Sequence, residues 1–272
     1  MLKTRIITAV VLLAVLLLAI LSGSMYVFAG LVVIFFAGAA WEALRLFNNR
    51  YAIAGALVWS AALVWVIFSG SFRQSVLLCG LCVAIWVVRL VPALKLGLPS
   101  LQGFGNRLLT GIYGVAILGA FIALMMLYQR SVLYMFSVMA IVWIADIGAY
   151  FCGKAFGKRK LAPTISPGKS WEGAIGGCLA VLAIGTATVF VPALRDTFAV
   201  QLYLKWNWSG LLAGLILMVA ASVVGDLFES QLKRRAGMKD SSNLLPGHGG
   251  VLDRIDALIP TLPLAVLIAY WM

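Results

Sequence analysis

The chain has 272 residues, of which 63% are hydrophobic and only 11% are charged. This composition excludes a soluble globular protein and indicates a membrane protein with several spanning segments. The net charge is +12. Anionic lipid headgroups are sufficient partners for such a charge, so nucleic acid need not be invoked.

Apolar segments of about 20 residues, the length of a spanning helix, cover most of the chain. The short alternating segments of a membrane β-barrel are not seen. We therefore expect an all-α, polytopic integral membrane protein with about nine transmembrane helices; eight or ten are alternatives, because only residues 22–25 separate the first two segments. The predicted segments are 6–22, 25–44, 52–69, 75–92, 108–128, 131–152, 172–194, 208–231 and 251–271.

The first segment follows Met-Leu-Lys-Thr-Arg, which resembles the start of a signal peptide, but no Ala-x-Ala cleavage site follows. We interpret it as the first transmembrane helix. The four cysteines lie in or beside apolar segments, without acidic or histidine neighbours that could complete a metal site. We interpret them as ordinary small residues. They are Cys79, Cys82, Cys152 and Cys178.

Basic residues predict the orientation. If the segments cross in alternation, 17 of the 21 lysines and arginines fall on the side of the N-terminus. The other four are Arg73, Arg130, Arg195 and Lys205. Cytoplasmic loops carry the excess of positive charge, so we expect a cytoplasmic N-terminus and, with nine spans, an external C-terminus.

The distribution of acidic residues predicts two modules with different functions. Eight of the nine acids lie beyond residue 145, and Glu42 is the single acid of the first half. We therefore expect an N-terminal transmembrane module at residues 1–107 and a C-terminal transmembrane catalytic module at residues 108–272. The proline- and glycine-containing stretch 91–107 is the predicted joint.

Four of these acids are expected near one depth, in the cytoplasmic half of the membrane: Asp146, Asp226, Asp253 and Asp256. Unpaired carboxylates there would be costly, and their oxygens, without a second histidine, suit a hard cation such as Mg²⁺. The sequence therefore predicts a metal site. The alternative is that the acids neutralise Lys233, Arg234 and Arg254 in structural pairs.

Two polar insertions carry further candidate residues. Residues 246–250, Pro-Gly-His-Gly-Gly, precede a helix and let backbone N–H groups approach a phosphate; His248 contacts a phosphate or leaving group, or only caps the loop. Residues 166–173 contain Lys169, a phosphate candidate, and Ser170 with Glu172, which can cap the next helix. A plain capped helix start is the alternative for this insertion. The basic residues at 158–160 we interpret as a topology signal.

The stretch from Ser230 to Asp256 resembles the signature of the phosphatidate cytidylyltransferases, also called CDP-diacylglycerol synthases. It reads Ser-x-Leu-Lys-Arg, four residues, Lys-Asp-x-Ser, then Leu-Pro-x-His-Gly-Gly-Val-x-Asp-Arg-Ile-Asp. Residues 146–158 and 166–173 also look typical of this family. The resemblance implies a Mg²⁺-dependent reaction of CTP with phosphatidate to give CDP-diacylglycerol and pyrophosphate. It also implies a bacterial-type cytoplasmic (inner) membrane location and a homodimer.

On this resemblance we expect three kinds of site residue. The carboxylates Asp226, Asp253 and Asp256, with Asp146 in addition, are expected to hold one or two cations. The expected catalytic residues are Lys233, Arg234, Lys239, His248 and Arg254. The expected substrate-binding residues are Ser166, Lys169, Ser170, Glu172, Gly249 and Gly250.

Two other functions fit parts of the pattern. A CTP-dependent lipid or polyprenol kinase would transfer the terminal phosphate of CTP and release CDP. A cation-coupled transporter would also carry intramembrane acids. The acids cluster on one side rather than at the midplane, and a long basic glycine loop adjoins them, which favours the cytidylyltransferase.

Overall fold

The computed structural model describes residues 2–272, with side chains described from residue 6 onward. Two basic residues used for the topology, Lys3 and Arg5, therefore lie outside the described side chains. In chain order the elements are α1 (Leu2–Leu21), α2 (Met25–Leu46), α3 (Ala52–Ser69), α4 (Phe72–Ile85), η1 (Trp86–Leu90), α5 (Val91–Leu96), α6 (Phe104–Arg130), α7 (Val132–Phe156), β1 (Lys160–Ala162), β2 (Ser166–Ser170), α8 (Trp171–Thr188), η2 (Pro192–Leu194), α9 (Phe198–Arg235), α10 (Leu252–Ile255) and α11 (Leu258–Tyr270).

The helical architecture confirms a polytopic membrane protein. In the described part of the chain, seven helices are long and apolar enough to cross a membrane: α2, α3, the continuous run from α4 to α5, α6, α7, α8 and α9. Helix α1 contributes a shorter apolar segment, Ile6–Leu21. The predicted ninth segment is divided into the short helix α10 and the 13-residue helix α11.

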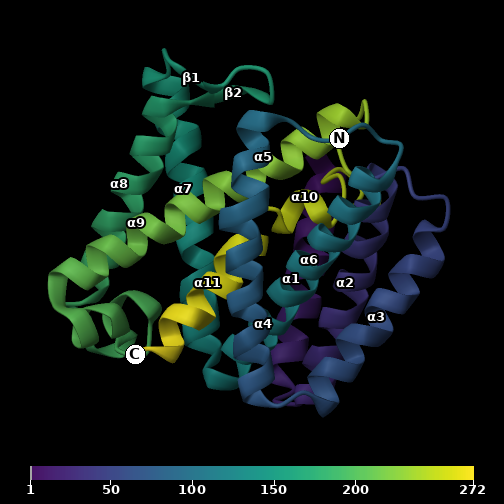
Figure 1. Cartoon of the computed structure of the whole chain (residues 1–272). Helices are drawn as coiled ribbons and strands as arrows, with labels where there is room; N and C mark the ends of the chain where they lie inside the picture. The colour runs from purple at the N-terminus through teal and green to yellow at the C-terminus, as the bar shows by residue number, and fades with distance from the viewer. Residues whose placement is uncertain (1) are drawn as a thin grey trace.

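One part of the chain departs from the all-α prediction. Residues predicted as a polar insertion before the seventh span instead form an antiparallel hairpin, in which Lys160 pairs with Ser170 and Ala162 with Ser166. The hairpin stands above α7 and α8 (Figure 1). The short strands satisfy backbone groups that the chain exposes between the two helices.

Two helices are irregular for identifiable reasons. Helix α4 widens into a π-helical turn, Trp86–Leu90, just before Pro92, because proline donates no backbone hydrogen bond and its ring crowds the preceding turn. Helix α9 is kinked at Trp206 and Asn207, where Asn207 has φ +56° and ψ −160°, a non-helical conformation that interrupts the helix. The predicted segment 208–231 therefore corresponds to the part of α9 after the kink.

Helices α7 and α8 pack together through glycines. A methyl group added to Gly177 would lie 2.4 Å from the carbonyl oxygen of Ala145, and one added to Gly148 would lie 3.0 Å from the Cα of Gly177. Small residues allow helix backbones to approach this closely in a membrane. The pair α7 and α8 thus forms a closely packed wall, on which the hairpin rests.

A single buried core joins the two predicted modules. The ring of Phe228 in α9 lies 5.2 Å from that of Tyr113 in α6 and 5.6 Å from that of Trp86 in η1, measured between centroids. Phe47, at the end of α2, packs against Tyr113 at 6.0 Å. The division at residue 107 stays a prediction, and these contacts cross it.

The polar loops gather at one end of the molecule. The hairpin, α5 and α10 lie toward the end that carries the N mark, and the C mark lies at the opposite end (Figure 1). Thr8 of α1 donates a hydrogen bond of 2.9 Å to the carbonyl of Pro246, which places the glycine loop beside the start of the chain. The two termini therefore lie at opposite ends, as the predicted topology requires.

Candidate functional site

A pocket of about 400 Å³ lies between α7, α8, α9 and the hairpin. Alanines and glycines form much of its wall, and a few polar side chains reach into it: Asp146, Lys154, Lys169, Ser170, Ser222 and Asp226. The fold thus brings the predicted residues Asp146, Lys169 and Asp226 together from three elements. Small walls and convergent polar groups are typical of a ligand site.

Lys169 and Asp226 form an ion pair across the pocket. Each side chain is 28% exposed, so the pair is accessible from the pocket. Lys169 lies on β2 and Asp226 lies on α9. The pair therefore attaches the hairpin to α9, the helix that contains the first residues of the signature sequence. Asp226 also accepts a hydrogen bond from Ser230, one turn later, at 3.3 Å.

The hairpin is held by its two ends. Ser170 accepts a hydrogen bond from the Gly173 N–H at 3.1 Å, which confirms its predicted role as the N-cap of α8. Glu172 accepts hydrogen bonds from the N–H groups of Lys158 and Arg159, each at 3.1 Å. Glu172 therefore fixes the start of the hairpin, while Ser166 begins β2 opposite Ala162.

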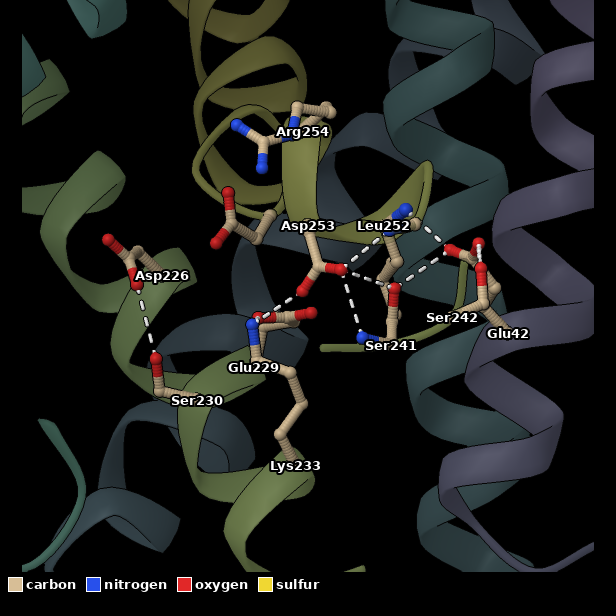
Figure 2. Close-up of polar contacts among 12 residues, drawn as sticks. Glu42, Asp226, Glu229, Ser230, Lys233, Ser241, Ser242, Leu252, Asp253 and Arg254 are labelled. Carbon is tan, nitrogen blue, oxygen red and sulfur yellow. Dashed lines mark hydrogen bonds and ion pairs between the residues drawn. The ribbon is translucent and has the colours of Figure 1, made fainter. Parts of the chain in front are cut away.

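A second polar cluster lies beside the pocket, where α9 meets residues 236–251, the signature loop that connects α9 to α10 (Figure 2). The ammonium of Lys233 is 2.6 Å from Asp253 Oδ1 and also pairs with Glu229, one turn earlier in α9. These side chains are 13%, 6% and 0% exposed respectively. A lysine enclosed by two carboxylates is well compensated for its burial.

Asp253 uses its second oxygen for the loop. Oδ2 accepts hydrogen bonds from the N–H of Ser241 at 2.9 Å, the hydroxyl of Ser241 at 2.9 Å and the N–H of Gly250 at 2.8 Å. Hydrogen bonds from Lys233, Gly250 and Ser241 thus compensate for the burial of Asp253.

The alternative to a metal site was that the acids neutralise Lys233, Arg234 and Arg254 in structural ion pairs. This alternative is correct for Lys233 and wrong for the two arginines. Lys233 pairs with acids as that alternative requires. Arg234 instead contacts the carbonyl of Ile165 at 3.4 Å, and the Nε of Arg254 donates to the carbonyl of His248 at 3.0 Å. These two arginines are largely exposed, as is Lys239, and their positive charge remains available to an anionic ligand.

The glycine loop needs its glycines for close packing. Gly247 and Gly249 have φ of +78° and +83°, which favours glycine. A methyl group added to Gly249 would lie 2.8 Å from Asp253 Oδ2, and one added to Gly250 would lie 2.0 Å from the hydroxyl of Ser241. We predicted that N–H groups of this loop approach a phosphate; in the structure the N–H of Gly250 instead donates to Asp253. His248 Nδ1 is buried without a hydrogen-bond partner.

Sequence reasoning assigned no role to Glu42. Glu42 of α2 is fully buried and accepts hydrogen bonds from the signature loop (Figure 2). One signal could have identified Glu42, since it is the single acid of the first half and lies within an apolar segment, where an acid is costly and therefore a functional candidate.

The carboxylates fit a hard cation by their chemistry. Asp226 lies in the pocket with Asp146. Both side chains offer oxygen ligands, which Mg²⁺ prefers. Within residues 2–272 as described, no three Asp, Glu, His or Cys side chains are close enough to hold one metal ion; Lys169 supplies the positive charge beside Asp226 instead. The four cysteines carry free thiols.

Comparison with known proteins identifies the family. The chain is 43% identical to a phosphatidate cytidylyltransferase of Pseudomonas aeruginosa over 275 residues, which cover 97% of this chain and 95% of the relative. It is 52% identical over 126 residues to one from Haemophilus influenzae (46% of this chain and 42% of the relative). It is 43% identical over 143 residues to one from Bacillus subtilis (53% and 49%). The sequence model of the cytidylyltransferase family matches residues 3–272, and the chain belongs to this family.

Proposed function

We propose that the chain is a phosphatidate cytidylyltransferase, an enzyme that converts CTP and phosphatidate to CDP-diacylglycerol and pyrophosphate. The observation that carries this proposal is the 43% identity to a curated enzyme of that name along nearly the whole of both chains. The pocket supports it, because basic and acidic side chains face one cavity beside membrane-spanning helices.

The reaction needs little acid–base chemistry from the protein. An oxygen of the phosphatidate phosphate forms a bond to the α-phosphorus of CTP, the bond from that phosphorus to the bridging β-phosphate oxygen breaks, and pyrophosphate leaves. The attacking phosphate is already ionised near neutral pH. Transfer at phosphorus depends mainly on alignment and neutralisation of charge, which agrees with a site built from lysines, arginines and carboxylates.

The cations of the chain are assigned to the substrate phosphates. Lys169 reaches the pocket from the hairpin, and Lys233, Arg234, Lys239 and Arg254 surround the signature loop. In this proposal they balance the triphosphate and the lipid phosphate, while the glycine loop and His248 contact the nucleotide. The lipid chains stay among the helices, so the phosphate is presented near the membrane surface.

Mg²⁺ is the proposed cofactor. Asp226, with Asp146, Asp253 and Asp256, would hold one or two such ions, which would neutralise the nucleotide phosphates. Lys169 pairs with Asp226 and Lys233 pairs with Asp253, so each carboxylate already has a positive partner. A cation would join or replace that partner.

The proposed location is a bacterial cytoplasmic membrane, with the site on the cytoplasmic side, where CTP is available. Its support is the charge asymmetry of the loops and the gathering of the polar segments at the N-terminal end (Figure 1). A homodimer stays a prediction of the family resemblance.

One assay tests the proposal. Purified protein is supplied with phosphatidate, Mg²⁺ and each nucleotide in turn, and both the lipid product and the released phosphate compound are measured. CDP-diacylglycerol with an equal amount of pyrophosphate is expected, and EDTA should stop its formation. Release of CDP with a phosphorylated lipid would show a kinase instead, and the absence of any nucleotidyl lipid would refute the proposal.

A further inference from the structure

Glu42 contacts two separate parts of the signature loop and its junction with α10. Its Oε2 accepts a hydrogen bond from the hydroxyl of Ser241 at 3.0 Å and from the N–H of Leu252 at 2.6 Å. Its Oε1 accepts from the hydroxyl of Ser242 and from the N–H of Val251 at 3.0 Å. One side chain of α2 therefore joins the middle of the loop to the start of α10.

A buried carboxylate of this kind is rare in a membrane helix. Glu42 is 0% exposed, and among the side chains that the structure describes no lysine, arginine or histidine pairs with it. A buried charge is costly unless hydrogen bonds compensate for it. Four donors supply that compensation, and all four belong to the signature loop and the first residue of α10.

The contacts of Glu42 continue to Asp253. The hydroxyl of Ser241 lies 3.0 Å from Glu42 and 2.9 Å from Asp253 Oδ2, and with one proton it donates to one carboxylate at a time. Gly250 donates its N–H to the same oxygen of Asp253, and a methyl group on Gly250 would lie 2.5 Å from Glu42 Oε1. Glu42 and Asp253 thus hold the same short piece of backbone from opposite sides (Figure 2).

We propose that Glu42 is a positioning residue, which fixes residues 241–252 so that Asp253 faces Lys233. It touches neither the pocket nor Lys233, and it acts through Ser241 and the backbone of α10. This inference rests on the proposed function for its catalytic consequence. It also gives the N-terminal part of the chain a direct part in the site.

Glutamine is an informative replacement because it keeps the size of the side chain. Its amide nitrogen must take the place of Oε1 or of Oε2, and so must face the N–H of Val251 or of Leu252. Serine hydroxyls can rotate to accept a hydrogen bond, but a backbone N–H cannot. Either orientation of the glutamine therefore loses one backbone anchor.

The experiment compares Glu42→Gln and Ser242→Ala with Ser60→Ala as the matched control. Ser60 is a buried hydroxyl in α3 that bonds only to its own helix, at Ala56. Loss of one or two hydrogen bonds to a charged group should lower kcat of Glu42→Gln by about 10- to 100-fold, and Ser242→Ala by about 3- to 10-fold. The KM for phosphatidate should change little in either variant.

Limited trypsin digestion supplies a readout that does not depend on activity. Lys239 and Arg254 flank the anchored segment and are exposed. Glu42→Gln should be cleaved there several-fold faster than Ser60→Ala, while cleavage elsewhere stays the same. If the wild-type protein makes no CDP-diacylglycerol, the proposed function fails, but this digestion still tests the anchor.

The combination with Ser241→Ala separates positioning from general destabilisation. Glu42→Gln and Ser241→Ala should be less than additive in kcat, whereas Glu42→Gln and Ser60→Ala should be additive. If Glu42→Gln does not fold, Ser242→Ala alone decides. A Ser242→Ala enzyme that matches Ser60→Ala in kcat and in digestion overturns the inference, as does a folded Glu42→Gln enzyme with wild-type kcat and digestion.

Discussion

The change Asp253→Asn tests the centre of the second cluster. The side chain keeps its size, but one oxygen becomes an amide nitrogen. If the nitrogen takes the place of Oδ1 it faces the ammonium of Lys233, 2.6 Å away. If it takes the place of Oδ2 it faces the N–H groups of Ser241 and Gly250. Donors then face donors in either orientation, and the negative charge is lost in both.

The contacts give the size of the effect. The bond to Lys233 is lost in the first orientation and the two backbone N–H bonds are lost in the second. At about 1.5–3 kcal/mol for each bond to a charged group, the loss is about 1.5–6 kcal/mol. If this cost falls on the transition state, kcat/KM drops by at least about tenfold. The cost is local to the loop and α10, because the hydrophobic core that joins α6, α9 and η1 does not include Asp253.

The assay measures CDP-diacylglycerol formation at ordinary Mg²⁺ concentration, with size-exclusion chromatography in detergent to verify folding. Asp196→Asn is the matched control, because Asp196 is an exposed acid between η2 and α9 and the same chemical change there should leave activity within about twofold, as is usual for exposed positions. Asp253→Asn should be folded and almost inactive. Turnover near the wild-type rate would refute both the charge argument and the proposed cation site at Asp253.

Three further changes test other parts of the structure. Lys169→Met removes one of the two lysines of the pocket and should raise the KM for CTP by about tenfold or more; an unchanged KM would remove Lys169 from the phosphate contacts. Gly177→Ala pushes a methyl group against α7 and should cost about 1–3 kcal/mol of stability, measured as a lower melting temperature. Gly30→Ala is its control, since nothing lies within 4 Å of the added methyl group, and it should be neutral or slightly stabilising. Ser170→Ala removes the cap of α8 and should cost about 1 kcal/mol; an unchanged melting temperature would contradict that role.

Sequence alone predicts much of the helical architecture because apolar length is a strong signal in a membrane protein. The start predicted at residue 208 agrees with the end of the kink at Asn207. The hairpin was not predicted, because Ser-Pro-Gly-Lys-Ser has few residues that favour strands and its pairing depends on contacts with residues 160–162. The break between α10 and α11, at Asp256 and Ala257, was also missed, because residues 251–271 were read as one segment.

The site shows a similar limit. Asp226 and Lys233 share a helix, so their spacing placed them correctly on one part of α9. Glu42 lies about 200 positions before its partners, Ser241 and Val251, and no local pattern in the sequence connects them. The partners of Lys233 were found only in part, because the choice between a ligand and a neighbouring acid depends on three-dimensional geometry.

The glycine and alanine wall between α7 and α8 has a consequence for how the pocket can change. These residues have no side-chain rotamers, so the wall keeps its shape unless a whole helix moves. Lys154, near the end of α7, and Lys169, on the hairpin, are instead long side chains with many rotamers. A bound molecule therefore contacts a rigid wall and two adjustable charges, and selection for a different lipid or nucleotide would act first on the adjustable charges.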